Sequence, residues 1–169
     1  IPHYFGFVDS TWRKKKTDNV FNKIVSRIIP ELGHIYPIFR YHIAASESIS
    51  HHDRALMIQI KKKLNRVARS HKDCYIFCPL ALKSHLDHVI VRNICASTFG
   101  ERVIFWSDFP YNIQRKVDLR AIDNMGLHLF LWKNSFEKKK KLIRGYESQM
   151  KLLFPRGHIP LIPERYYIK

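Results

Sequence analysis

Short apolar runs alternate with helix-like patterns along most of the chain, and this alternation limits the fold more than any other feature. Three runs, Asp73 to Leu80, Arg102 to Trp106 and Leu127 to Trp132, are too short for buried helices and rich in aromatic and branched residues, which predicts strands. Apolar residues at helical spacing predict four helices, at about Val20 to Ile29, Arg54 to Ser70, His85 to Ser97 and Ser135 to Leu153. Strands that alternate with helices predict an α/β fold with a mostly parallel sheet.

Three of the predicted helices have an apolar stripe, and we expect the stripe of the last one to be buried. In the helix from Val20 the stripe consists of Val20, Phe21, Ile24, Val25, Ile28 and Ile29. In the helix from Arg54 the stripe consists of Leu56, Met57, Ile60, Leu64, Val67 and Ala68. In the last helix it consists of Phe136, Leu142, Ile143, Tyr146, Met150 and Leu153. The tail from Pro155 to Lys169 contains three prolines, so we expect irregular chain on the surface. The 169 residues are enough for one domain with a core, and we expect a single domain over 1–169.

The formal net charge of +16 is the most unusual bulk property of the chain. It is compatible with nucleic acid, an acidic membrane surface or an anionic substrate as partner. The excess lies mainly in basic runs, and such runs are usually solvated helix or loop faces. They begin at Arg13, Lys61 and Lys138. Because no Gly-rich loop, RNA-recognition signature or zinc-finger spacing accompanies them, we expect no specific nucleic-acid partner.

The apolar segments and the cysteines indicate the environment of the protein. No segment approaches the roughly 18 consecutive apolar residues of a membrane span, and a secretory pattern is not seen, so we expect a soluble, cytoplasmic protein without a transmembrane segment. Cys74 and Cys78 are four residues apart in a predicted strand, which separates their α-carbons by roughly 13 Å and rules out a disulfide. We expect these two cysteines and Cys95 to be buried, reduced thiols.

The stretch KSHLDHVIV, from Lys83 to Val91, joins a predicted strand to a predicted helix. In a parallel sheet, ligands bind at the carboxyl ends of strands, where loops lead into helices. Ser84 and Asp87 have the spacing of a capping box, which would make them a helix start only. His85 and His88 are three residues apart and therefore neighbours on a helix. Two histidines beside a carboxylate suit a site that binds a metal through one imidazole and moves protons with the other.

Several segments resemble, in order, those of the PIG-L (LmbE-like) family of zinc-dependent N-deacetylases. The run FCPLALKSHLDHVIVRNI is similar to the family's second signature, in which a strand and a Pro-Leu loop precede His-x-Asp-His. Similar segments elsewhere are YFGFVD from Tyr4, FWSDFPY from Phe105, the Lys141 to Gln149 helix and the ERYY ending from Glu164. The resemblance implies a Rossmann-like arrangement, with the sheet flanked by helices.

The resemblance also implies roles for individual residues. His88 would be a ligand of Zn²⁺ or another divalent metal, and His85 would stabilise the tetrahedral intermediate or protonate the leaving amine. Asp87 would orient His85 through a hydrogen bond. The implied reaction removes an N-acetyl group from an N-acetylglucosamine-type amino sugar or its conjugate, through a metal-bound water. Asp9, Asp108 and Tyr111 lie in family-like segments, where they would line the sugar pocket or serve as loop caps and turn residues.

One family signature has no counterpart in the sequence. The family's upstream His-Pro-Asp-Asp segment supplies two zinc ligands and the general base, and catalytic zinc needs about three protein ligands. We therefore expect the first βαβ unit to be missing here, either as an absent N-terminal segment or as a second chain. The alternatives are a catalytically inactive remnant that binds a glycan or nucleotide-sugar, and a basic nucleic-acid-binding protein.

Two further features are interpreted from the residues alone. The group His51-His52-Asp53 is dense in potential ligands, but adjacent histidines diverge, so we expect a loop in which Asp53 caps the following helix. The lysine-rich faces would attract an anionic conjugate of the sugar, such as a nucleotide- or lipid-phosphate-linked one, or a membrane surface that bears it.

Overall fold

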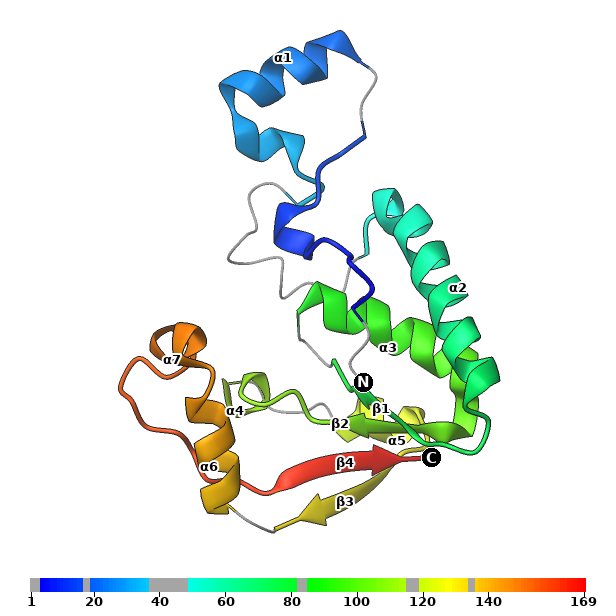
Figure 1. Ribbon diagram of the computed structural model, residues 1–169, viewed down its shortest axis with the longest axis vertical. Helices are drawn as coiled ribbons and strands as arrows, with labels where there is room; N and C mark the ends of the chain where they lie inside the picture. The colour runs from blue at the N-terminus through cyan, green and yellow to red at the C-terminus, as the bar shows by residue number, and fades with distance from the viewer. Residues whose placement is uncertain (1–3, 17–18, 37–48, 82–84, 115–118, 134–135) are drawn as a thin grey trace.

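The computed structural model describes residues 4–16, 19–36, 49–81, 85–114, 119–133 and 136–169 (Figure 1). These residues form an α/β fold in which helices pack against a four-stranded sheet, and this confirms the predicted class. Among the described residues, no helix is both long enough and apolar enough to cross a membrane.

The sheet is mixed, and only part of it is parallel. Its strands are β1 (Ile76–Pro79), β2 (Val103–Trp106), β3 (His128–Trp132) and β4 (Glu164–Ile168), in the spatial order β1-β2-β4-β3. β1 and β2 are parallel and are connected through a helix, as the alternating sequence pattern predicts. β4 runs antiparallel to both of its neighbours. Among the described strands, parallel pairing is therefore limited to β1 and β2, and the predicted mostly parallel sheet is only partly present.

The inner position of β4 corrects the prediction of an irregular surface tail. Pro155, Pro160 and Pro163 all precede the strand, and the residues that follow them are free to donate ladder hydrogen bonds. The strand is rich in aromatic side chains, which favour sheet, and Tyr167 is only 2% exposed. β4 thus inserts between β2 and β3 and joins the two halves of the sheet (Figure 1).

The four predicted helices are present, one of them divided in two, and two further helices were not predicted. The helices are α1 (Val20–Ile28), α2 (Arg54–Ser70), α3 (Leu86–Phe99), α4 (Tyr111–Gln114), α5 (Leu119–Asn124), α6 (Phe136–Arg144) and α7 (Glu147–Leu153). Those not predicted are α4 and α5. The predicted helix from Ser135 to Leu153 is two helices, because Gly145 and Tyr146 interrupt it; glycine costs about 1 kcal/mol in a helix interior. Its stripe is not buried, since Leu142 and Tyr146 are 64% and 70% exposed.

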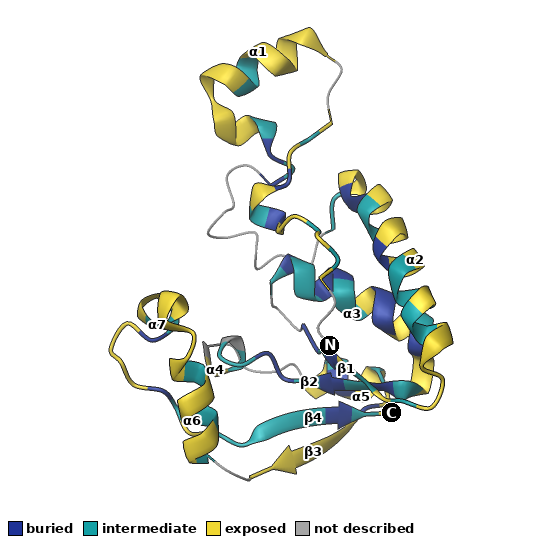
Figure 2. Ribbon diagram, in the orientation of Figure 1, coloured by how far each residue is buried: buried dark blue, intermediate teal, exposed yellow. Residues whose placement is uncertain are grey.

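The core lies around α3. One cluster joins one face of the sheet to α3 and α5, and its buried members include Cys78, Cys95, Phe99, Val103, Phe105, Ile122 and Tyr167. A second cluster joins α2 to α3 through Ile60, Leu86, Ile90 and Ile94, and most of the predicted stripe of α2 is at least half buried. Figure 2 shows the buried residues gathered along α3 and the inner strands. α3 therefore packs against the sheet through one cluster and against α2 through the other.

The described cysteines are free thiols, as predicted. Cys78 on β1 and Cys95 on α3 are buried, whereas Cys74, which precedes β1, is only half buried. The prediction of three buried thiols is wrong for Cys74 because the strand begins at Ile76, and Cys74 lies in the turn before it.

Candidate functional site

The loop after β1 is held in place by groups from α3 and from the end of β2. Ala81 is fully buried and has a positive φ of 53°, a conformation that residues with a side chain rarely adopt. The Oδ2 atom of Asp108 accepts the Ala81 backbone N–H at 2.7 Å. The Arg92 guanidinium donates to the carbonyl oxygens of Leu80 and Ala81. The carboxyl ends of β1 and β2 are thereby joined next to the first turn of α3.

His85 is the N-cap of α3. Its Nδ1 accepts the backbone N–H of Asp87 at 3.3 Å. The predicted capping box places Ser84 in this position, but Ser84 lies outside the described residues, and the capping side chain is that of His85. Because Nδ1 accepts a hydrogen bond, the proton of the neutral ring is on Nε2. The Nε2–H group of His85 is thus a hydrogen-bond donor.

His88 is held in the opposite tautomer by Asp108. Its Nδ1 lies 2.6 Å from Oδ1 of Asp108, whose side chain is 6% exposed. An ionised carboxylate only accepts, so the Nδ1 of His88 carries the proton and Nε2 has the lone pair. A carboxylate behind one imidazole nitrogen is the usual arrangement of a metal-binding histidine. Asp108 was predicted to line a sugar pocket or cap a loop, and here it contacts His88 and Ala81.

Asp87 contacts the N-terminal segment. Its Oδ1 accepts from the Arg13 guanidinium at 2.6 Å, and its Oδ2 accepts the backbone N–H of Ser10 at 2.9 Å. The closest approach of the carboxylate to His85 is 3.9 Å, between Oδ2 and Nδ1. At that distance the carboxylate makes no hydrogen bond to His85, and the hydrogen bond between the two residues comes from the Asp87 backbone N–H.

Arg13 also binds Asp53, and this network was not predicted from the sequence. Arg13 donates to Asp53 at 3.0 Å, and the Tyr36 hydroxyl donates to the same Asp53 oxygen at 2.6 Å. Asp53 is 1% exposed and does not cap α2, contrary to prediction. Arg13 opens a basic run that was interpreted as solvated, yet it is buried. Nothing in the local sequence distinguishes Arg13 from the lysines that follow it, because its partners are distant in the chain.

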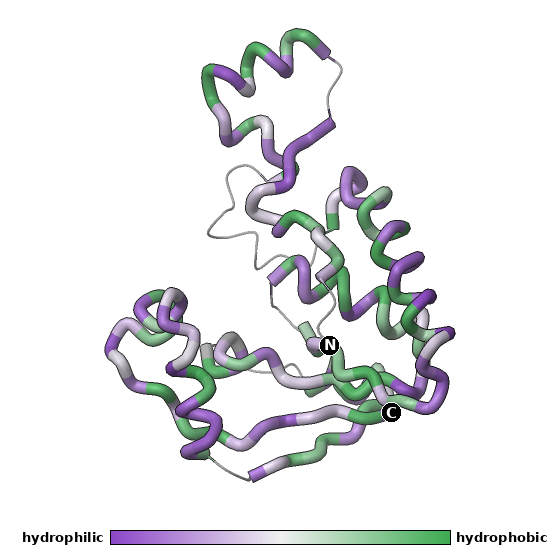
Figure 3. Tube along the Cα trace, viewed as in Figure 1, coloured by the Kyte–Doolittle hydropathy of each residue, from purple (hydrophilic) through white to green (hydrophobic). Residues whose placement is uncertain are grey.

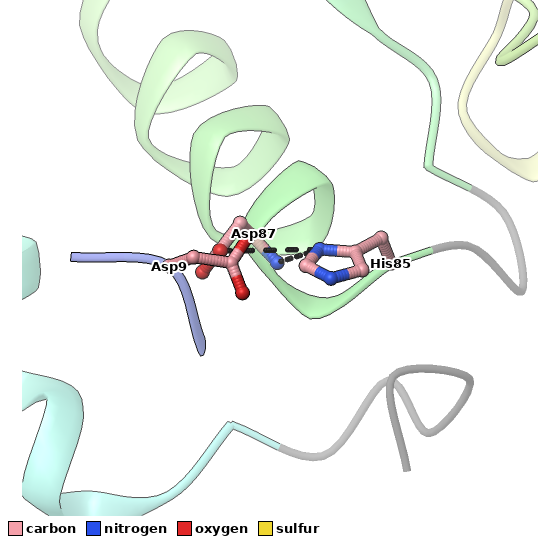
Figure 4. Close-up of side chains that lie close together, drawn as sticks. All are labelled: Asp9, His85 and Asp87. Carbon is pink, nitrogen blue, oxygen red and sulfur yellow. Dashed lines mark hydrogen bonds and ion pairs between the residues drawn. The ribbon is translucent and has the colours of Figure 1, made fainter. Parts of the chain in front are cut away.

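Asp9 lies beside His85 and Asp87, and Figure 4 shows the three side chains together. Their ligand atoms lie within 4.8 Å of one another. Partial burial acts to raise the pKa of Asp9, but hydrogen bonds from Thr11 and the charges of His85 and Arg13 outweigh it and lower that pKa. Tyr111 begins α4, and its side chain lies outside the described part of the chain.

These residues fit a catalytic zinc site only in part. His88 has the orientation of a ligand, but it does not belong to the group of Asp9, His85 and Asp87. In that group the Asp87 carboxylate already accepts from Arg13 and Ser10, and Asp9 accepts from Thr11. Zinc in catalytic sites takes about three protein ligands. Within the described ranges, one well-oriented ligand is present, and the set is not completed.

The function proposed below is argued from this geometry, because comparisons with known proteins found no relative. No protein-family model, curated protein or solved structure matches the chain. The likeness to the PIG-L family accordingly rests on the short segments from Tyr4, Phe105, Lys141 and Glu164 and on the signature that contains His85 and His88.

Proposed function

We propose that this chain carries the histidine half of a metal-dependent N-deacetylase site that acts on an N-acetylglucosamine-type amino sugar or its conjugate. The observation that supports the proposal is the contact between His88 and Asp108 at the carboxyl ends of β1 and β2, one turn from His85. Ligand sites in α/β proteins lie at such strand ends. Zn²⁺ or another divalent ion bound by His88 would supply Lewis acidity to the amide carbonyl.

The residues of the chain have distinct roles in this proposal. Asp108 is a positioning residue, because it fixes the tautomer of His88. The Nε2–H group of the neutral His85 ring donates to the amide oxygen, which gains negative charge as the carbonyl is attacked. Protonation of the leaving nitrogen by His85 would require a doubly protonated ring, in which Nδ1 no longer accepts the Asp87 N–H. Asp87 positions His85, because its backbone N–H donates to Nδ1 and so holds the Nε2–H tautomer of the ring. The described residues do not complete the metal ligands, so the remaining ones would come from another segment or a second chain.

The proposed substrate class is an anionic conjugate of the amino sugar. The proposed location of the enzyme is the cytoplasm. The net charge of +16 raises the local concentration of anionic molecules, and this effect decreases as salt screens it. Turnover of phosphate-linked and neutral N-acetylglucosamine compounds across ionic strength tests this part. Equal, salt-independent rates for the two compounds would remove the anionic group from the proposal.

Zinc binding and acetate release test the proposal directly. In a zinc titration followed by NMR of the imidazole nitrogens, the Nε2 signal of His88 should move. The exposed His158 provides the internal control. With the segment or second chain that supplies the remaining ligands present, release of acetate from N-acetylglucosamine compounds should be lost in His88→Ala and His85→Ala and kept in His158→Ala. If zinc leaves the Nε2 signal of His88 unchanged, the proposal is refuted.

A glycan-binding or nucleotide-sugar-binding remnant without hydrolysis is the second candidate. The observation that favours it is the engagement of Asp87 by Arg13 and Ser10, which leaves the carboxylate less available as a metal ligand or base. Sugar affinity without metal and without acetate release would select this candidate.

A further inference from the structure

Residues 13–16 and 19–36 belong to an arm whose outer part stands away from the sheet and its helices (Figure 1). Lys14 and His34 form an antiparallel bridge at its base. There the Lys15 N–H donates to the carbonyl oxygen of Gly33, and the Ile35 N–H donates to the carbonyl oxygen of Arg13. Arg13 and Tyr36 are buried below this bridge. The outer part of the arm consists of α1 and the 3-10 helix η2 (Pro30–Gly33).

The helix α1 is amphipathic, but its apolar side faces outward. Val20, Phe21, Ile24 and Ile28 are 67%, 70%, 52% and 74% exposed, and none of the residues of α1 is buried. The side of α1 that carries Asn22 and Ser26 faces η2 instead. These two residues, together with Val25 at the edge of the apolar side, line a cavity of about 220 Å³ with Lys15, Leu32 and Gly33. A helix that packs on its own domain normally buries its apolar side.

Basic side chains border this apolar side. Lys23 and Arg27 are both exposed and four residues apart, so they lie on one edge of the helix, next to Val20 and Ile24. Lys14 and Lys16 are also exposed, and they lie in the segment before α1. Figure 3 shows hydrophobic and hydrophilic segments alternating along α1. The arm therefore presents a row of apolar side chains with a cationic border.

We propose that the arm is a docking element for an anionic lipid bilayer, with α1 lying in the plane of the interface. An interfacial helix has an apolar face with Phe and aliphatic residues and a polar face with Lys and Arg, and its binding depends on both. Lysine and arginine can keep their charge among the headgroups while their stems cover apolar surface. A nucleic acid would neutralise the cations but would leave Phe21 and Ile28 uncovered.

Vesicle flotation with the purified chain tests the proposal. The chain should float with mixed phosphatidylcholine and phosphatidylserine vesicles and not with pure phosphatidylcholine. The double variant Phe21→Ser, Ile28→Ser should abolish binding, whereas Leu119→Ser, Leu152→Ser, which alters side chains of equal exposure on α5 and α7, should leave it unchanged. All four changes are at exposed positions, so equal melting temperatures will show that the fold is kept.

A charge variant provides the second line of the test. Replacing Lys23 and Arg27 with Gln should weaken binding about fivefold for each lost charge. The same replacement at the exposed Lys138 and Lys141 of α6 should have a smaller effect. The proposal is overturned by an absence of vesicle binding, by equal binding to pure phosphatidylcholine, or by a serine double variant at positions 21 and 28 that binds like the unchanged protein. The last result would indicate general charge attraction to an anionic surface.

Discussion

His85 and His88 lie with their ring centroids 5.8 Å apart and present opposite chemistry at Nε2. His85 accepts the Asp87 N–H at Nδ1 and so has its proton on Nε2, whereas His88 donates from Nδ1 to Asp108 and so has a lone pair on Nε2. One turn of α3 thus offers a hydrogen-bond donor and a potential metal ligand side by side. The parallel pairing of β1 with β2 makes this arrangement possible, because Asp108 follows β2 and His85 follows β1.

Replacing Asp108 with Asn should release His88. The carboxylate accepts two hydrogen bonds, from the Ala81 N–H and the His88 Nδ1–H, and an amide has only one oxygen to do so. We expect the free energy of unfolding to decrease by about 1–3 kcal/mol. Zinc affinity should decrease about 10- to 100-fold. Denaturant unfolding and a zinc titration measure the two effects, and Asp123→Asn on the exposed side of α5 is the control. Unchanged zinc affinity would contradict the role of Asp108.

Replacing Arg13 with Ala should strongly destabilise the protein. Arg13 is buried and pairs with Asp53 and Asp87, so its removal leaves two carboxylates without their cation. Breaking a buried ion pair on one side costs about 3–5 kcal/mol. Urea unfolding measures the loss. Arg27→Ala, in the same arm but exposed, should change the free energy of unfolding by less than about 0.5 kcal/mol.

A double-mutant cycle separates the ion pair from other effects of the Arg13 change. If Arg13 and Asp53 interact as the 3.0 Å contact indicates, Arg13→Ala with Asp53→Asn should cost less than the sum of the single changes. We expect a coupling free energy of about 1–3 kcal/mol. Strictly additive losses would show that Arg13 stabilises the arm only through packing and its contact with Asp87.

The Tyr36 hydroxyl should make stability depend on alkaline pH. Burial, together with the hydrogen bond to Asp53, raises the pKa of Tyr36 from 10.0 to about 12. The folded state therefore holds the phenol proton more tightly than the unfolded state. Its stabilising contribution is complete below pH 10 and is lost as the pH rises through about 12. The difference in urea midpoint between the unchanged protein and Tyr36→Phe should shrink across that interval. A constant difference would contradict the buried hydrogen bond.

The periodic parts of the fold were predictable, and the pairing of distant segments was not. The ranges of α2, β2 and β3 follow from local patterns, because apolar spacing and the length of an apolar run indicate the type of element. Helical apolar spacing also predicted a buried stripe in the helix from residue 135 to residue 153, but Leu142 and Tyr146 of that stripe are exposed. Periodicity shows that a side is apolar but does not show what covers it. The strand β4 was missed because its prolines end before Glu164 and its partners are remote.

The candidate site was predictable only where its residues are neighbours in the chain. The run from Ser84 to His88 identified the start of α3 and both histidines. The groups that determine what those histidines do come from 20 residues away, for Asp108, and 74 residues away, for the contact between Arg13 and Asp87. A carboxylate in a loop and an arginine in a basic run have no local pattern that indicates burial. Their roles depend on the strand order, which local spacing does not encode.

The three thiols should react at two distinct rates. A hydrogen bond with Cys95 and burial raise the pKa of the Cys78 thiol, and the same hydrogen bond lowers the pKa of Cys95. Both side chains lie in the core, so a reagent reaches neither of them in the folded protein. Cys74 is half buried in the turn before β1. With an excess of a thiol reagent at neutral pH, we expect one rapid modification per chain and two that follow only unfolding. Cys74→Ser should remove the rapid phase alone. A rapid phase that survives this change would mean that the contact between β1 and α3 opens frequently, since Cys78 and Cys95 are packed across it.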